Sequence, residues 1–178
     1  MRFLLIQLIG LLGNLLIMAV MQTNNRRLTL IAQGVACILW TVHFWLLGAM
    51  TASLINLISF GRSVLFFFND RKWAKSKFFL WLFIVLFIAD SLLTWEGPRS
   101  LLPCIGMCST TLALWTTSTK KMRLCYLCSS PPWLVYDLIS GSYSCALMET
   151  IALISYIVAI FRFDRKRTAP SENTEEET

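Results

Sequence analysis

An unbroken apolar run in the middle of the chain limits what this sequence can fold into more than any other feature. Residues 78–95 read FFLWLFIVLFIADSLLTW, with no Lys, Arg or Pro and with a single charge, Asp90, near one end. At about 1.5 Å per residue, a helix of this length spans most of a hydrocarbon core about 30 Å thick. Because so apolar a surface is unfavourable in water, we expect the segment to lie in lipid.

The rest of the chain is almost as apolar as this run. Of its 178 residues, 56% are hydrophobic and only 15% are charged, and the mean hydropathy is +0.63. Soluble domains carry about 25% charged residues. We therefore expect an all-α membrane protein with no separate water-soluble domain. The first 22 residues are expected to form a membrane helix, since their apolar run is too long for a signal peptide.

Seven apolar segments, separated by short polar or glycine-containing turns, each have the length of a helix. We predict these helices at residues 3–21, 28–47, 51–68, 78–95, 101–117, 124–139 and 145–163. Because proline removes a backbone hydrogen bond, Pro131 and Pro132 are expected to interrupt the sixth helix, either as a hinge or as a fixed kink. The acidic sequence at the end of the chain is expected to be disordered.

Basic residues recur in every second loop of this arrangement. They follow helices one, three, five and seven: Arg26 and Arg27; Arg71, Lys72, Lys75 and Lys77; Lys120, Lys121 and Arg123; and Arg165, Lys166 and Arg167. The opposite side holds only Arg2 and Arg99. By the positive-inside rule, the N-terminus would lie outside the cell and the C-terminus in the cytoplasm.

The two halves of the chain look like two copies of one three-helix unit. At an offset of 96, residues 9–28 align with 105–124; after a three-residue deletion the offset becomes 93, and Trp40 aligns with Trp133. We therefore predict two parallel three-helix repeats with a connector helix between them. The first repeat covers residues 1–72, the connector 78–95, the second repeat 101–163, and a disordered cytoplasmic tail 164–178. Parallel repeats are one known transporter plan, with the site where the repeats meet.

Polar residues at helical spacing mark the faces that could line such a site. Asn14 shares a face of the first helix with Gln7 and Gly10, and Asn56 belongs to a serine-rich face of the third helix. Glu149 occupies the corresponding face of the seventh helix. A carboxylate inside an apolar helix costs at least about 2.5 kcal/mol unless it is paired or protonated. We expect Glu149 to be a substrate or proton site facing Asn56, or else to make a helix–helix hydrogen bond.

Other ionisable residues lie within the apolar segments. His43, the only histidine, would be either a hydrogen-bonded interface residue or a proton relay, and Glu149 is the other candidate for proton coupling. Arg62 would either extend to the cytoplasmic interface or pair across the bundle. Asp90 and Asp137 lie near predicted helix ends, so we expect solvated interfacial positions for both.

Several function classes find no support in the sequence. It contains no nucleophile–base pair and no glycine-rich phosphate loop, so we expect no enzyme and no cofactor. The Cys125-x-x-Cys128 pair has no second pair or nearby histidine, which argues against a metal site. A disulfide between Cys104 and Cys145 remains open. The basic residues lie in short loops rather than in a patch with exposed aromatics, so nucleic acid is not an expected partner.

Two long stretches of the chain resemble a known family. Residues 43–72, HFWLLGAMTASLINLISFGRSVLFFFNDRK, and residues 133–167, WLVYDLISGSYSCALMETIALISYIVAIFRFDRKR, are similar to the YgjV family of bacterial inner-membrane proteins. That family is in turn distantly similar to the SWEET and PQ-loop (MtN3-like) group. The resemblance implies a multi-pass protein of the bacterial inner membrane, and movement of a small solute.

The same resemblance suggests a solute class. In sugar transporters of the SWEET group, an Asn pair on the third and seventh helices contacts the solute. Asn56 matches the first position, whereas Glu149 occupies the second, which favours a polar or cationic solute or proton coupling. The leading hypothesis is a transporter whose site is lined by Asn14, Asn56, Trp133 and Glu149. The alternative is a non-transporting membrane interaction or scaffold protein; membrane lipid is a partner in both, and homo-oligomerisation is left open.

Overall fold

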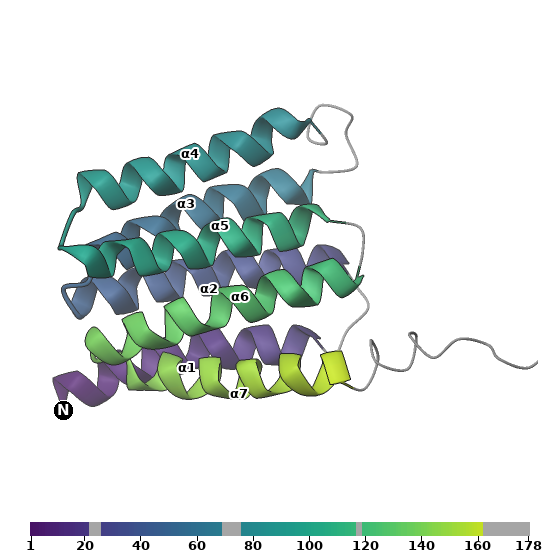
Figure 1. The fold of residues 1–178 in the computed structure, drawn as a ribbon. Helices are drawn as coiled ribbons and strands as arrows, with labels where there is room; N and C mark the ends of the chain where they lie inside the picture. Colours follow the sequence, from purple (N-terminus) through teal and green to yellow (C-terminus); the bar gives the residue numbers. More distant parts are fainter. Residues whose placement is uncertain (22–25, 69–75, 117–118, 162–178) are drawn as a thin grey trace, which may run out of the picture.

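A computed structural model shows that the chain is helical throughout the part it describes, which is residues 1–21, 26–68, 76–116 and 119–161 (Figure 1). Seven α-helices and one 3₁₀ turn lie within these residues, and no strand does. They are α1 (Arg2–Met21), α2 (Arg26–Leu46), α3 (Met50–Phe67), α4 (Lys77–Leu93), η2 (Pro98–Ser100), α5 (Leu101–Trp115), α6 (Thr119–Ile139) and α7 (Tyr143–Ala159). The all-α prediction and the number of helices in these ranges are therefore confirmed.

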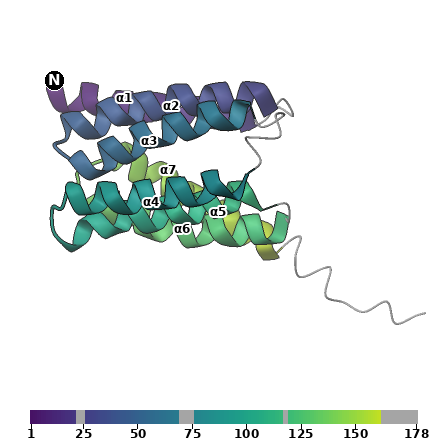
Figure 2. The same cartoon turned by 90° about the horizontal axis from the view of Figure 1, so that it is seen from above.

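The helices run side by side in a bundle whose two halves have the same order of neighbours. α2 packs against both α1 and α3, and α6 packs against both α5 and α7. α4 contacts α3 and α5, while α1 contacts α7. Seen from above, α1 to α3 form one layer and α4 to α6 another, with α7 between them (Figure 2).

Two tight turns at the same end of the bundle use the same backbone motif. Gly48, between α2 and α3, has φ of 76°, and Gly141, between α6 and α7, has φ of 72°. After each glycine, the next backbone N–H reaches back to the helix, from Ala49 to the Phe44 carbonyl and from Ser142 to that of Asp137. This is the Schellman arrangement, in which a residue with positive φ stops the helix and satisfies its last carbonyls.

The segment that follows α4 is attached to the start of α3. The Thr51 hydroxyl donates to the Thr94 carbonyl over 2.9 Å, and the Met50 N–H donates to a Glu96 carboxyl oxygen over 3.0 Å. α3 has no side-chain cap of its own at Ala49. Glu96 therefore supplies a negative charge at the N-terminus of a neighbouring helix, where the helix dipole favours it, and α4 is held beside α3.

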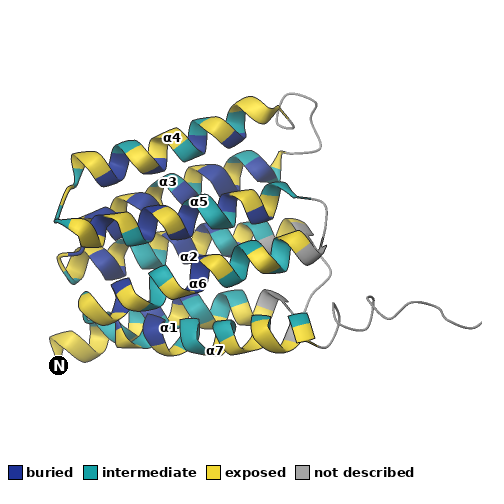
Figure 3. Cartoon of the chain, viewed as in Figure 1, coloured by how far each residue is buried: buried dark blue, intermediate teal, exposed yellow. Residues whose placement is uncertain are grey.

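The interior of this bundle holds polar as well as apolar side chains, and much of its outer surface is apolar. Polar and charged side chains such as Asn56, Arg62 and Asp137 are buried, while Leu4 and Trp81 are among many exposed apolar residues, with 67% and 63% of their surfaces accessible (Figure 3). By length and hydropathy alone, two helical segments qualify as membrane spans, Arg2–Ala19 and Met50–Phe67. Leu30–Leu46 and Tyr143–Val158 are apolar but shorter.

The sixth helix differs from its prediction in where it begins. α6 begins at Thr119 rather than at residue 124, because the polar sequence that opens it is rich in the good helix formers Lys, Met and Arg. Pro131 and Pro132 lie inside α6, which continues through both, so they do not end the helix, and their role as a hinge or a fixed kink stays a prediction. The fixed φ of proline, about −65°, is itself helical, so each proline removes a hydrogen bond without forcing the chain out of the helix.

Other boundaries differ by a few residues. The connector α4 ends at Leu93 rather than at residue 95, and α7 begins at Tyr143 rather than at 145. The predicted disordered tail at 164–178 lies outside the described residues, as do the basic residues Arg71, Lys72 and Lys75.

Candidate functional site

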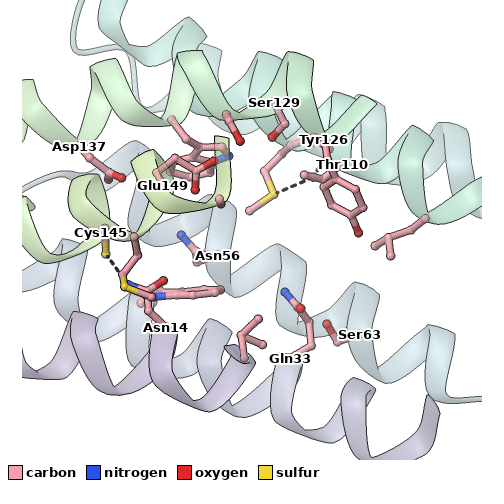
Figure 4. A pocket seen from close by; sticks show the side chains of 18 of the residues that line it. Asn14, Gln33, Asn56, Ser63, Thr110, Tyr126, Ser129, Asp137, Cys145 and Glu149 are labelled. Carbon is pink, nitrogen blue, oxygen red and sulfur yellow. Dashed lines mark hydrogen bonds between the residues drawn. The ribbon is translucent and has the colours of Figure 1, made fainter. Parts of the chain in front are cut away.

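A cavity of about 330 Å³ lies between the two halves of the bundle (Figure 4). Side chains from α1, α2, α3, α5, α6 and α7 line it, and α4 contributes none of its lining residues. Its apolar walls carry a distinct polar set: Asn14, Gln33, Asn56, Arg62, Ser63, Thr110, Tyr126, Ser129, Ser130, Asp137, Cys145, Glu149 and Tyr156. An apolar cavity with a few convergent polar groups is typical of a small-molecule site.

Two carboxyl groups face the cavity from the second half. Glu149 on α7 and Asp137 on α6 lie close enough for their charges to interact, and the Ser130 hydroxyl lies beside Glu149. Figure 4 shows both side chains at one end of the cavity. Asp137 is 3% exposed, and its Oδ1 atom has no hydrogen-bond partner among the described residues. A buried polar atom of this kind carries a large desolvation cost until something pairs with it.

Two asparagines line the cavity from the first half. The Asn14 amide nitrogen on α1 donates to its own helix at Gly10, over 3.0 Å, and contacts the Cys145 sulfur on α7 at 3.6 Å. The Asn56 amide nitrogen on α3 donates to the Ala52 carbonyl over 2.8 Å. These bonds to the preceding helical turn fix both amides beside the cavity.

A tryptophan of each half lies against a glycine of the neighbouring helix. A Cβ atom added at Gly106 would lie 2.5 Å from Trp133, and one added at Gly13 would lie 2.9 Å from Trp40. Only glycine allows these indoles to pack so closely on α5 and α1. Trp133 also contacts Phe44 and Tyr136, with ring centroids 6.1 and 6.2 Å away, so the cavity has an aromatic wall.

Arg62 is buried among uncharged groups. Its guanidinium donates to the Thr111 hydroxyl, contacts the Met107 sulfur at 3.9 Å and lies 5.7 Å from the centre of the Phe87 ring. The residue is 3% exposed, and its Nε has no hydrogen-bond partner in the described part of the chain. Arg62 therefore does not extend to the interface. It points across the bundle and lines the cavity.

Hydrogen bonds close the bundle at the end that carries the two glycine turns. Gln7 on α1 donates to the Gly141 carbonyl over 2.7 Å and accepts from the Ser144 N–H over 2.9 Å. His43 on α2 bonds the Ile6 carbonyl over 2.8 Å and the Ser142 hydroxyl over 2.7 Å. We call these contacts the Gln7–His43 seal. They join the first half of the chain to the turn between α6 and α7.

The structure brings most of the predicted site residues together. Asn14, Asn56, Trp133 and Glu149 all line the one cavity. The cavity lining does not include His43, which is fully buried in the seal, or Pro131 and Pro132. Proton coupling through Glu149 or His43 and the hinge at Pro131 and Pro132 stay predictions.

The sequence interpretation missed two charged residues of the cavity, Asp137 and Arg62. The prediction that Asp90 and Asp137 are solvated is wrong, because their surfaces are only 6% and 3% exposed. Both lie near a helix end, but their side chains turn toward the interior. Helical spacing could have revealed Asp137, because it lies four residues after Trp133 and so on the same face of α6.

The cysteines are free thiols in this structure, including Cys104 and Cys145, so the disulfide considered between them is not present. Among the described residues, no group of three or more His, Cys, Asp or Glu side chains is arranged to hold a metal ion.

Comparison with known proteins places the chain among membrane proteins. The profile of a family named Imp-YgjV and described as "Bacterial inner membrane protein" matches residues 4–167. A curated relative from Escherichia coli (strain K12), "Inner membrane protein YgjV", is 28% identical over 124 residues. The match covers 70% of this chain and 65% of that protein, less than two thirds of its length. No solved structure matches, so the distant similarity to the SWEET and PQ-loop group stays a prediction.

Proposed function

Because the chain belongs to the Imp-YgjV family of bacterial inner membrane proteins, we propose that it is a multi-pass transporter of a small polar solute. In this proposal seven helices cross the membrane, and the solute binds in the cavity between the two three-helix units. The observation that carries it is the cavity itself, into which Glu149, Asp137, Asn14 and Asn56 project from both halves. Ionisable residues inside a membrane bundle are costly and typically mark a solute or proton pathway.

The distribution of apolar and charged side chains supports a membrane-spanning bundle. Large apolar residues face outward along every helix, which is expected where lipid is the solvent. Arg27, Lys77, Lys121 and Arg123 all fall at the start of α2, α4 and α6, at the end of the bundle opposite to the glycine turns (Figure 1). By the positive-inside rule this basic end is cytoplasmic, and the N-terminus and the Gln7–His43 seal are outside.

Constant spacing between the two halves supports an internal repeat. α6 and α7 begin 93 residues after α2 and α3, and α6 ends 93 residues after α2. The same interval relates the Gly48 and Gly141 turns, and the Gly13–Trp40 and Gly106–Trp133 contacts. We infer two copies of one unit joined by α4, at a single offset and without the deletion expected from the sequence. Two parallel units with a connector would then meet at the cavity.

The seal supports an alternating-access cycle. At the N-terminal end, polar bonds join α1 and α2 to the turn before α7, whereas the cavity lining extends toward the basic end as far as Met18 and Leu114, both of which are exposed. The conformation is therefore closed at the outer end. Transport would require the seal to open, with α6 bending at its two prolines. No catalytic reaction, cofactor or metal belongs to this proposal.

Uptake into proteoliposomes tests the proposal. The purified chain would be reconstituted and offered a panel of radiolabelled sugars, amino acids and amines. We expect uptake of at least one solute by the wild type, and a loss of about tenfold or more in Glu149→Ala, which removes a charged contact. Asp90→Asn is the matched control, because Asp90 is a buried carboxyl that does not line the cavity.

Either of two outcomes would count against transport. If wild-type vesicles accumulate no solute above empty vesicles, or if Glu149→Ala takes up every solute as fast as the wild type, the transport proposal fails. A non-transporting interaction protein then becomes the better explanation for the basic end of the bundle.

A further inference from the structure

The cavity contains buried charges of both signs, and they do not pair with one another. Glu149, which is half-buried, and Asp137, which is buried, supply carboxyl groups, and the buried Arg62 supplies a guanidinium group. None of the ion pairs, hydrogen bonds or electrostatic contacts of Arg62 involves either carboxyl group. Buried charges are normally paired, since an unpaired one loses its hydration without compensation.

Two residues of the cavity lining, Asp137 and Arg62, each have an atom without a hydrogen-bond partner in the part of the chain that the structure describes. Asp137 Oδ1 and Arg62 Nε are each buried and have no hydrogen-bond partner within the described ranges. The first is an acceptor, so it calls for a group with N–H or O–H donors. The second is a cationic donor, so it calls for an anionic acceptor. The two ends therefore favour opposite chemical groups.

The two ends are a short distance apart along the bundle. Ser130, which lies beside Glu149, and Tyr126, which interacts electrostatically with Arg62, are one turn apart on α6. At about 5.4 Å per turn, the Glu149 carboxyl and the Arg62 guanidinium are separated by roughly 5–11 Å. Asp137 lies eleven residues after Tyr126 on α6, and so about three turns from the guanidinium end. A molecule with charges a few atoms apart and a hydrogen bond at each end spans this interval.

We infer that the cavity binds a short zwitterion, an amino acid whose ammonium group contacts Glu149 and whose carboxylate contacts Arg62. The ammonium N–H groups donate to the Glu149 carboxyl oxygens, and the carboxylate supplies the missing anion for the guanidinium. Trp133 and Phe44 line the same cavity and supply apolar surface for the carbon atoms of the ligand. A simple cation leaves Arg62 unpaired, and a simple anion is repelled by the two carboxyl groups. The zwitterion is the substrate class of the proposed transporter. That the protein moves this solute rests on the proposed function, whereas binding of the solute in the cavity does not.

Equilibrium binding to the full chain in nanodiscs tests the inference. The zwitterions are glycine, β-alanine and γ-aminobutyrate, and the single-charge analogues are propylamine and butyrate. Binding is measured by calorimetry or by tryptophan fluorescence, since Trp40 and Trp133 line the cavity. We expect at least one zwitterion to bind about tenfold or more tightly than either analogue, because each analogue loses one charged contact.

Variants at the two ends separate the two contacts. Arg62→Gln is expected to weaken the zwitterion about tenfold while propylamine binds as before, and Glu149→Gln is expected to weaken both. Asp90→Asn, outside the cavity, should bind all ligands as the wild type does. Arg62→Lys keeps the charge, so it should retain part of the preference for the zwitterion. If Arg62→Gln folds poorly, the binding preference of Arg62→Lys tests the same contact.

The inference is overturned if no zwitterion binds, if propylamine or butyrate binds as tightly as the best zwitterion, or if Arg62→Gln keeps the wild-type preference. Uptake distinguishes this failure from failure of the proposed function. Uptake of another solute without zwitterion binding removes the inference and leaves transport standing. Zwitterion binding without uptake leaves the inference standing and removes transport.

Discussion

His43 Nε2 lies 2.7 Å from the Ser142 hydroxyl oxygen, and this contact joins α2 to the turn that begins α7. The other ring nitrogen bonds the Ile6 carbonyl of α1 over 2.8 Å. A single imidazole thus connects three helices from opposite ends of the sequence. α1 approaches this point closely, because a Cβ at Gly10 would lie 2.9 Å from the His43 ring.

His43→Leu is expected to open the end of the cavity that the proposed topology places outside, because it removes both hydrogen bonds while keeping an apolar side chain. Cys145 lines the cavity and is only 8% exposed, so its thiol reports the opening. We expect faster modification of Cys145 by a membrane-impermeant maleimide in right-side-out vesicles, located by mass spectrometry. Ser59→Ala, which removes a bond within α3, should not change the rate. Equal rates in His43→Leu and wild type would show that the seal does not control access.

Gly106→Ala is expected to destabilise the protein by about 1–3 kcal/mol through overpacking against Trp133. The matched control is Gly61→Ala on α3, where an added Cβ meets nothing within 4 Å. That substitution should be neutral or stabilising by about 0.5–1 kcal/mol, the usual difference between glycine and alanine in a helix. Thermal unfolding in detergent, followed by tryptophan fluorescence, measures both. A Gly106→Ala variant as stable as Gly61→Ala would contradict the close Gly106–Trp133 packing.

Gly48→Ala and Gly141→Ala are each expected to cost about 1–2 kcal/mol for a different reason. Both glycines have positive φ, and an added Cβ would meet no atom within 4 Å, so the cost is purely conformational. Asparagine tolerates this backbone region better than alanine, so Gly48→Asn and Gly141→Asn should be milder than the alanine variants. The same unfolding assay ranks the four variants, and equal stabilities for alanine and asparagine would argue against the left-handed turn.

The proposed topology predicts the behaviour of reporter fusions in bacteria. Alkaline phosphatase, which is active only outside the cytoplasm, should be active when fused after Gly48, Gly97 or Gly141. It should be inactive when fused to the full chain, whereas a fluorescent protein at the same position should fluoresce. Activity at every junction, or the opposite pattern, would contradict seven spans with a cytoplasmic basic end.

Helical periodicity explains how much of the site could be predicted. Asn14, Asn56 and Glu149 interrupt apolar helices, and their spacing places each on a polar face, so three helices could be oriented from sequence alone. The three residues selected in this way share one cavity, which Trp133 also lines. The predicted helix boundaries are less accurate than the predicted faces. A helical turn of polar residues, such as the first turn of α6, extends a helix beyond its apolar segment.

The charged residues at helix ends could not be placed by the same reasoning. Depth along a helix was taken as the guide to solvation, which put Asp90 and Asp137 at the interface. The direction of a side chain depends on which face meets a neighbouring helix, and the sequence does not state those neighbours. The sequence alone likewise allows the Arg62 side chain to extend along α3. Its contacts with Thr111 on α5 and Phe87 on α4 place the guanidinium inside the bundle.

The separated charges in the cavity have a consequence for how the protein can be studied. A compound that satisfies both ends binds the native fold and not the unfolded chain, so it raises the melting temperature by an amount that grows with the logarithm of its concentration relative to Kd. At a concentration a hundredfold above Kd, the gain is about 2.7 kcal/mol. The melting temperature of the protein therefore reports ligand binding directly. A thermal-shift screen of a metabolite library would identify the ligand before any transport assay is built.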